Sequence, residues 1–299
     1  MIKLGFIGFG EAAFNISKGL FAEGFTGIIA YDVMANQKPM CNSIYSRAKE
    51  AEVTILPNVG DVVKQVDVVI VSVPSSYTMD ACHSIIQYLI PGQIYVDVGA
   101  STPEIKKQEW ELVKVKGALF SDSAMLGSLP ALKHKVPILA SGNGASKFRD
   151  IFIPYGMKID VVGELPGEAS AIKLLRSIFM KGIAALMIEM LEGSEAYGVS
   201  DQVINSISSS LDNISFKEHL DRIVTGTAIH AHRRAEELVG SIQLLEDVGL
   251  KYYMTEISKK GHNMLEPYNF ADRFIDHNPN GWKEILDIIM TERLDIGLR

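Results

Sequence analysis

The sequence predicts an α/β fold, with an N-terminal Rossmann dinucleotide-binding domain followed by an all-α C-terminal domain. In the first half of the chain, short runs of consecutive Val and Ile alternate with helical stretches. Unbroken apolar runs of this kind are typical of parallel strands that are covered by helices on both faces. A glycine-rich turn follows the first run, and strand patterns cease after Gly163, where long helical patterns begin.

The apolar runs define the expected strands and the domain boundary. Turn residues bound each run, and a helical pattern over residues 11–24 separates the first two. The expected strands cover residues 2–8, 27–32, 66–73, 93–99, 117–122, 136–141 and 158–163. The change in character near residues 164–166 predicts a first domain over residues 1–164 and a helical domain over residues 165–299.

The glycine-rich turn "GFGEAA" at residues 8–13 predicts dinucleotide binding. Between a strand and a helix, Gly8 allows a tight turn, Gly10 lets the backbone approach a pyrophosphate, and Ala13 keeps helix and strand close. Asp32 ends the second expected strand, where a carboxylate binds the ribose hydroxyls of adenosine. This carboxylate repels a 2′-phosphate and favours NAD, while Lys38 keeps NADP open as a cofactor. The alternative interpretation is that the small residues only permit close packing.

Composition restricts the remaining function classes. The formal net charge of −7 disfavours nonspecific binding to nucleic acids or to anionic membranes. The two cysteines, Cys41 and Cys82, and the seven histidines show no metal-binding spacing, so we expect neither a metal site nor a disulfide framework. The chain opens with a strand-and-glycine pattern in place of a signal peptide, and we therefore expect a cytoplasmic protein.

The stretch "ASAIKLLRSIFMKGIAALMIEML" at residues 169–191 predicts a core helix with one polar stripe. Lys173, Ser177 and Lys181 are spaced i, i+4 and i+8, which places them nearly in line on one helical face. The charges and the length of the stretch argue against a membrane span. A buried lysine that extends its amine to solvent is one explanation of the stripe, and a functional polar face is the other.

Five motifs along the chain resemble a known family when they are taken in order. They are "GFGEAA", "VSVPSS" (71–76), "YVDVGASTPE" (95–104), "FSDSAMLGS" (120–128) and "GEASAIKLLRS" (167–177). Together they resemble the β-hydroxyacid dehydrogenase superfamily, which includes 6-phosphogluconate and 3-hydroxyisobutyrate dehydrogenases. The resemblance implies a Rossmann domain joined to a helical domain, and a homodimer. It also implies that Lys173 acts in proton transfer, on a helix face that meets the substrate in the cleft between the domains.

The predicted site residues follow from these motifs. The cofactor-binding set is Gly8, Phe9, Gly10, Glu11, Ala12, Ala13, Asp32, Val73, Pro74 and Ser75. The substrate-binding set is Ser101, Gly127, Ser128, Ser177 and Lys181, and the catalytic residue is Lys173. Alcohol oxidation needs a base for the hydroxyl proton. Free lysine has a pKa near ~10.4, and burial beside a second cation, such as Arg176 or Lys181, would lower the pKa of Lys173.

Three departures from the family pattern concern the substrate. The usual loop D-A-P-V-S-G-G is replaced by "DSAMLGS", in which Leu126 occupies the serine position and Ser128 the last glycine position. Ser177 stands where an asparagine is usual, and Lys181 stands where phosphogluconate enzymes have a tyrosine that contacts the substrate phosphate. Lys181 therefore favours an anionic substrate, and an ion pair with Glu189 is the alternative.

The segment "HAHRRAEELV" (230–239) replaces the late K-D-L-x-x-A motif of the family. Its histidine and double arginine resemble a poorly characterised phosphogluconate-dehydrogenase-like branch. Residues 230–234 either reach an anion of the substrate or cofactor, or form a solvated helix face with Glu236 and Glu237.

The expected function is an NAD(P)-dependent oxidoreductase that transfers a hydride between a nicotinamide cofactor and a small anionic hydroxyacid, a class that includes phosphorylated and sugar acids. The protonated form of Lys173 could also assist decarboxylation of a β-keto acid. Two alternatives stay open. One is a catalytically silent dinucleotide sensor, which the altered substrate loop favours. The other is an imine reductase, against which Lys173 counts.

Overall fold

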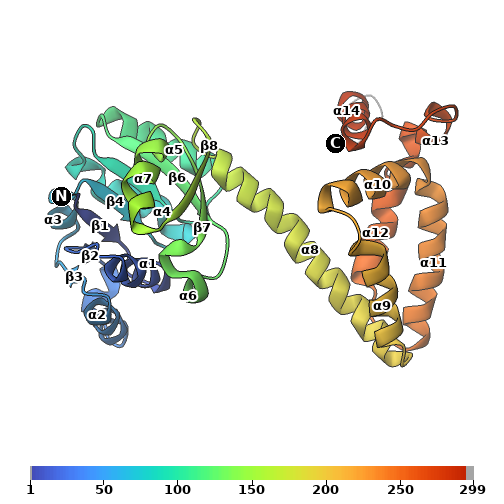
Figure 1. Ribbon diagram of the computed structural model, residues 1–299, viewed down its shortest axis with the longest axis horizontal. Helices are drawn as coiled ribbons and strands as arrows, with labels where there is room; N and C mark the ends of the chain where they lie inside the picture. Colours follow the sequence, from blue (N-terminus) through green and yellow to red (C-terminus); the bar gives the residue numbers. More distant parts are fainter. Residues whose placement is uncertain (1, 294–299) are drawn as a thin grey trace. The chain divides into compact units, whose positions relative to one another are not determined.

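An eight-stranded sheet forms the centre of the first part of the chain (Figure 1). The computed structural model describes residues 2–293. The strands are β1 (Leu4–Ile7), β2 (Ile29–Tyr31), β3 (Thr54–Ile55), β4 (Val68–Val71), β5 (Ile94–Asp97), β6 (Leu119–Met125), β7 (Pro137–Ser141) and β8 (Lys158–Gly163). Their order across the sheet is β3-β2-β1-β4-β5-β6-β7-β8. All seven expected strands are present, and the two-residue β3 is an addition.

The sheet is parallel except at one pair of strands. Strands β6 and β7 are antiparallel, and at this one pair the sheet departs from the parallel arrangement that the apolar runs indicate. The connection between them contains the short helix α6 (Leu129–Leu132). Such a connection is too short to supply the crossover helix that a parallel pair of strands needs, and the chain therefore turns back.

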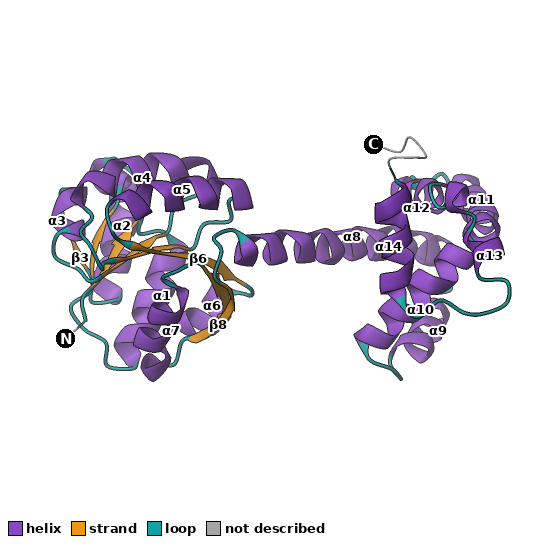
Figure 2. Ribbon diagram, turned by 90° about the horizontal axis from the view of Figure 1, so that it is seen from above, coloured by secondary structure: helices purple, strands orange, loops and turns teal. Residues whose placement is uncertain are grey.

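Helices cover both faces of this sheet, as the unbroken apolar runs predict. Besides α6, they are α1 (Glu11–Ala22), α2 (Met40–Glu50), α3 (Val59–Val63), α4 (Thr78–Ile85), α5 (Pro103–Val115) and α7 (Ala145–Phe152). One buried core contains Leu20 of α1 and Phe152 of α7, and the other contains Ile85 of α4 and Val113 of α5. Figure 2 shows α1 and α7 on one side of the sheet and α4 and α5 on the other. The Rossmann-type fold class is confirmed.

Helix α8 (Glu168–Ala196) follows the last strand, and the two compact units of the chain divide within it, between Ile178 and Phe179. The boundary expected from the sequence, after residue 164, lies in the connection between β8 and α8. The first turns of α8 stay with the sheet because their backbone amides bond to side chains of β6 and β7, at Asp122 and Ser141.

The expectation that α8 is a buried core helix is wrong for the single chain. Leu175, Ile178 and Ile188 expose 65%, 71% and 60% of their surface, respectively. The helix is buried at Ala169 and Ser170, near its start, and again toward its end. An apolar sequence predicts that a helix is buried, but it does not identify the surface that packs against its side chains.

The described part of the second unit, beyond α8, consists of helices. They are α9 (Ser200–Leu211), α10 (Phe216–Ile229), α11 (Ala231–Asp247), α12 (Tyr253–Asn263), α13 (Phe270–Arg273) and α14 (Trp282–Glu292). A separate apolar core contains Ala228, Tyr268, Phe270 and Ile285. The all-α character of the C-terminal part is confirmed. Within residues 2–293, none of the helices has both the length and the hydropathy that crossing a bilayer requires.

Candidate active site

The turn after β1 has the geometry of an anion-binding helix start. Gly8 has φ +87°, and a Cβ at this position would lie 2.5 Å from the backbone oxygen of Ser72. Gly10 is the N-cap of α1 and supplies no side-chain cap, and a Cβ there would meet nothing within 4 Å. The helix start is thus free of a capping side chain and has space beside Gly10, as the approach of a pyrophosphate requires. The observed geometry fits the predicted cofactor.

Asp32 follows β2 and holds this turn in place. Its carboxylate accepts hydrogen bonds from the backbone amides of Phe9 at 2.7 Å and of Met34 at 2.8 Å. The sequence predicts a contact with ribose but gives no sign of this structural role. A carboxylate has about four lone-pair sites, so two amide bonds leave acceptor capacity for ribose hydroxyls.

The other predicted cofactor residues lie at the same edge of the sheet. Parallel strands β1, β2 and β4 have their carboxyl ends together, and Val73, Pro74 and Ser75 follow β4 there. A methyl of Val73 lies 2.8 Å from the position that a Cβ on Gly8 would take. In α1, the Glu11 side chain is exposed, Ala12 is partly buried and Ala13 is fully buried in the core. This edge is where open α/β sheets bind their ligands.

A group of buried charges lies where β5 ends beside the middle of β6. Asp97 and Asp122 are register partners on these strands, so their side chains project from the same face of the sheet. Lys106 of α5 forms ion pairs with both, at 3.6 Å from the Asp122 carboxylate, and also donates to the backbone oxygen of Gly99 at 2.9 Å. All three charged side chains are fully buried. We call Asp97, Lys106 and Asp122 the buried charge cluster.

Asp122 also binds the start of α8. Its carboxylate accepts from the backbone amides of Gly167 at 3.2 Å and Ser170 at 2.9 Å, and from the Ser170 hydroxyl at 2.7 Å. The Ser141 hydroxyl donates to it at 3.4 Å. A carboxylate at a helix N-terminus is stabilised by the free amides and by the helix dipole. Asp122 therefore sets the position of α8 on the sheet.

Lys173 lies one turn after Ser170 and is partly buried. Burial lowers the pKa of Lys173, and the Lys106 cation lowers it further, while the carboxylates of Asp122 and Asp97 act in the opposite direction. The net result is a pKa below that of an exposed lysine, as a general base requires. Lys106 acts here as the second cation, a role for which the sequence suggests Arg176 or Lys181.

The predicted substrate residues differ in their environments. Ser101 is buried, and its hydroxyl lies 3.5 Å from the Asp97 carboxylate. Gly127 and Ser128 are exposed in the loop after β6, and Ser177 is partly buried on α8. Lys181 is exposed and belongs to the second unit.

The proposed Lys181–Glu189 ion pair is not formed. Glu189 accepts from the backbone amides of Met254 and Thr255, each at 2.8 Å, and so caps α12. Among residues 2–293, Lys181 has no salt-bridge partner.

Three side chains of the basic segment at residues 230–234 bind neighbouring groups of the second unit. His232 and Arg233 bind the carboxylates of Glu266 and Glu237, at 2.9 and 2.5 Å. Arg234 donates to the Thr227 hydroxyl at 2.6 Å. The pairing of Arg233 agrees with the solvated-face interpretation of this segment.

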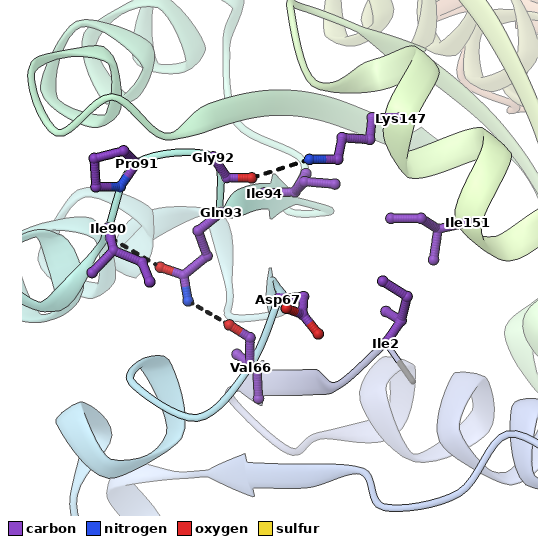
Figure 3. Close-up of a pocket in the computed structure, with 10 residues that line it drawn as sticks. All are labelled: Ile2, Val66, Asp67, Ile90, Pro91, Gly92, Gln93, Ile94, Lys147 and Ile151. Atoms are coloured by element: carbon purple, nitrogen blue, oxygen red, sulfur yellow. Dashed lines mark hydrogen bonds between the residues drawn. The ribbon is translucent and has the colours of Figure 1, made fainter.

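A cavity of about 240 Å³ in the first unit lies away from all these groups (Figure 3). It is lined by Ile2, Asp67, Gln93 and Lys147, among others, next to the amino ends of β1, β4 and β5. Lys147 donates across it to the backbone oxygen of Gly92 at 3.3 Å. The predicted site is at the opposite edge of the sheet. In the part of the chain that the structure describes, no three His, Cys, Asp or Glu side chains could hold a metal ion.

Comparisons with known proteins extend over both units. Residues 3–101 match a family described as NADP oxidoreductase coenzyme F420-dependent, and residues 195–261 match a domain of unknown function, DUF1932. An uncharacterised 28.5 kDa protein of Methanothermus fervidus is 28% identical over 89% of this chain and 99% of its own length. Mitochondrial 3-hydroxyisobutyrate dehydrogenase of Drosophila melanogaster is 23% identical over 68% of this chain and 63% of its own.

Solved structures agree with these relatives. A conserved protein of unknown function, whose structure was described as similar to 3-hydroxyacid dehydrogenases, is 29% identical with a TM-score of 0.61. The alignment covers 89% of this chain and 97% of that one. An imine reductase from Pseudomonas sp. has a TM-score of 0.72 over 90% of this chain and 95% of its own, at 13% identity, which shows a shared fold alone. The resemblance indicated by the five sequence motifs is confirmed.

Proposed function

We propose that this chain, which has the fold and the NAD(P)-binding domain of a 3-hydroxyacid dehydrogenase-like oxidoreductase, oxidises a small anionic hydroxyacid with Lys173 as general acid/base. One observation carries the proposal. A partly buried amine, with a lowered pKa, lies on α8 next to the buried charge cluster at the carboxyl edge of the sheet. Ligands of open α/β sheets bind at this edge.

The proposed chemistry of Lys173 is proton transfer. A lysine at its ordinary pKa of ~10.4 is protonated at neutral pH and cannot accept a proton. The lowered pKa of Lys173 increases the fraction of its amine that is neutral. The neutral amine accepts the proton of the substrate hydroxyl while the carbon that bears this hydroxyl loses its hydride. The nicotinamide, when bound, supplies the hydride acceptor. In the reverse direction the protonated amine returns this proton to the carbonyl oxygen.

NAD is the proposed cofactor. Gly8, Gly10 and the first amides of α1 would hold its pyrophosphate, and Asp32 would accept from the adenosine ribose. The Asp32 carboxylate disfavours a phosphate at the 2′ position through charge repulsion. The family matched by residues 3–101 is described by its use of NADP, so the affinity for both cofactors must be measured. A tighter Kd for NADP than for NAD would reverse this assignment.

Ser101, Gly127, Ser128, Ser177 and Lys181 are the proposed substrate contacts. Hydroxyl groups and a lysine amine donate hydrogen bonds to carboxylate or phosphate oxygens. Lys181 has no ion-pair partner within residues 2–293, which leaves its charge free for an anionic substrate.

A homodimer is proposed together with this function. Leu175, Ile178 and Ile188 of α8 are large apolar side chains that a single chain leaves exposed. A second copy would remove them from water, and each fully buried side chain of this size stabilises the association by about 1.5–3 kcal/mol. Light scattering should give twice the 32.8 kDa chain mass, and Ile178→Glu should shift it toward one chain. A monomeric wild-type protein would contradict the dimer. The cytoplasmic location stays a prediction.

The deciding experiment measures NADH formation from NAD, and NADPH formation from NADP, with hydroxyacids, sugar acids and their phosphate esters. Wild type, Lys173→Met and the control Lys107→Met, an exposed lysine of α5, are compared. We expect Lys173→Met to lower kcat by roughly 10²- to 10⁴-fold with unchanged cofactor Kd. Lys107→Met should match the wild type. Carbon dioxide release in the same reactions tests decarboxylation.

Two outcomes would refute the dehydrogenase. Cofactor binding without turnover of any substrate in the wild type would favour a dinucleotide sensor. NADPH-dependent reduction of imines that persists in Lys173→Met would favour an imine reductase.

A further inference from the structure

The buried charge cluster carries one positive and two negative charges. Two types of oxygen surround the amine of Lys106: the carboxylates of Asp97 and Asp122, and the backbone oxygens of Asp97 and Gly99. Burial opposes the charge of Lys106, but the two carboxylates outweigh this effect and raise its pKa. The amine therefore stays protonated at neutral pH, and the cluster has a net charge of about −1.

A fourth buried group next to the cluster is uncharged. Glu109 of α5 is fully buried, and the Tyr95 hydroxyl donates to it at 2.6 Å. Burial, followed by the charge of Asp97, raises the pKa of Glu109 to about 9. Glu109 is thus protonated at neutral pH and leaves the net charge of the cluster unchanged.

Lys173 is the titratable group that this net charge influences. The charged groups that act on it from packed elements are Lys106 of α5, Asp97 of β5 and Asp122 of β6. On its own helix, Arg176 is exposed one turn away and Lys181 is exposed two turns away. The two carboxylates favour a protonated Lys173, and the Lys106 cation opposes them.

Asp122, which is ion-paired to Lys106, also accepts from the backbone amide of Ser170 at 2.9 Å, and this places the cluster one turn from Lys173. We propose that Lys106 is a positioning residue for Lys173, and that its buried charge favours the neutral form of the Lys173 amine by balancing Asp97 and Asp122. The inference rests on the proposed role of Lys173 in proton transfer. Without Lys106, Lys173 would be the nearest cation to two buried carboxylates, and it would take up a proton to compensate them. A chain that still folds and binds its cofactor would then lack its base.

Three variants separate this electrostatic role from a structural one. Lys106→Gln removes the cation and changes the net charge of the cluster from about −1 to −2, which should raise the pKa of Lys173 by about one to three units. Asp122→Asn removes one anion from the cluster and should lower the pKa of Lys173. The double variant Asp97→Asn/Lys106→Gln loses one charge of each sign, and Lys173 should titrate as in the wild type. Lys107→Gln is the matched control, because Lys107 is exposed on the same helix.

The pKa of Lys173 can be measured without a substrate. The full chain is labelled with a trace of acetic anhydride across a pH series, denatured and then fully acetylated with the heavy reagent. Mass spectrometry of the peptide that contains Lys173 gives the labelling midpoint. The acid limb of the kcat/KM profile for the turned-over hydroxyacid should move with the same sign. A role of Lys106 in folding alone would not reproduce opposite shifts in Lys106→Gln and Asp122→Asn.

Unchanged labelling midpoints in Lys106→Gln and Asp122→Asn would overturn the inference, whatever the activity. If Lys106→Gln does not fold, Asp97→Asn is compared with the double variant: the single change should lower the labelling midpoint of Lys173, and the added loss of Lys106 should restore it. Equal midpoints in these two variants would overturn the inference. Shifted midpoints without turnover in any variant would support the coupling of Lys106 to Lys173 and refute the dehydrogenase. The two hypotheses therefore fail separately.

Discussion

Glu109→Gln should stabilise the first unit at neutral pH and flatten the pH dependence of its stability. The folded pKa of Glu109 is raised to about 9 by burial and by the charge of Asp97. In the unfolded chain a glutamate titrates near ~4.3. Between these values the folded state holds a proton that the unfolded state releases, so rising pH favours unfolding. The glutamine keeps the shape and the acceptor for the Tyr95 hydroxyl, and it has no proton to lose.

Because the folded state holds one more proton, the free energy of unfolding falls by about 1.4 kcal/mol for each unit of rising pH. Between about pH 6 and pH 8 the fall is about 2.7 kcal/mol. Urea unfolding at several pH values measures this slope. The chain has two tryptophans, Trp110 in α5 and Trp282 in α14. A Trp282→Phe background therefore leaves Trp110 as a fluorescent reporter of the first unit.

Two chains are compared: Trp282→Phe, and Trp282→Phe with Glu109→Gln added. The difference between their slopes of unfolding free energy against pH isolates Glu109, because the contributions of the other titrating groups are the same in both chains. Glu104→Gln, at an exposed position of the same helix, is the control and should keep the slope of the background. Identical slopes with and without Glu109→Gln would contradict a protonated Glu109, because they would show that the folded protein buries an ionised carboxylate at this position.

Substitutions in the glycine-rich turn, at Asp32 and in the second unit should also have distinct effects. Gly8→Ala should lower Tm strongly, because its Cβ would collide with the backbone of Ser72. Gly10→Ala should keep the Tm of the wild type but raise the Kd for NAD by at least about tenfold, because its methyl group would occupy the space beside the helix start. Asp32→Ser should weaken NAD binding and improve the Kd ratio toward NADP; an unchanged ratio would contradict the assignment. Glu189→Ala should lower the urea stability reported by Trp282 by about 2 kcal/mol, because it removes the cap of α12.

The sheet can be predicted because a strand that is buried on both faces needs a continuous run of apolar residues, which is visible in the sequence. Val68–Val71 and Ile94–Asp97 are fully buried, and both are nearly continuous apolar runs. Thr54–Ile55 escapes prediction because a two-residue strand with an exposed Thr54 forms no such run. The direction of β7 escapes it too, since an apolar run carries no information about the orientation of its neighbour.

The candidate site can be predicted from the sequence only where its residues lie close together along the chain. The glycine-rich turn places its residues within a few positions of one another, so its geometry follows from the motif. Lys106 and Lys107 are chemically identical neighbours in the sequence, yet one is fully buried and the other exposed. Only the packing of α5 on the sheet distinguishes them. The pairing of Asp97 with Asp122 likewise depends on the register between β5 and β6, which no single segment encodes.

The attachment of α8 to Asp122 has a mechanical consequence. The amides of Gly167 and Ser170 bond to this carboxylate, so the helix has a pivot one turn before Lys173. At about 1.5 Å per residue, the backbone of Lys173 lies about 4.5 Å beyond Ser170 along the helix axis. A tilt of about 10° around the pivot moves it by less than about 1 Å, which is smaller than the displacement of any residue farther along the helix. With so short a lever arm, bending of the long helix leaves the proposed base almost in place.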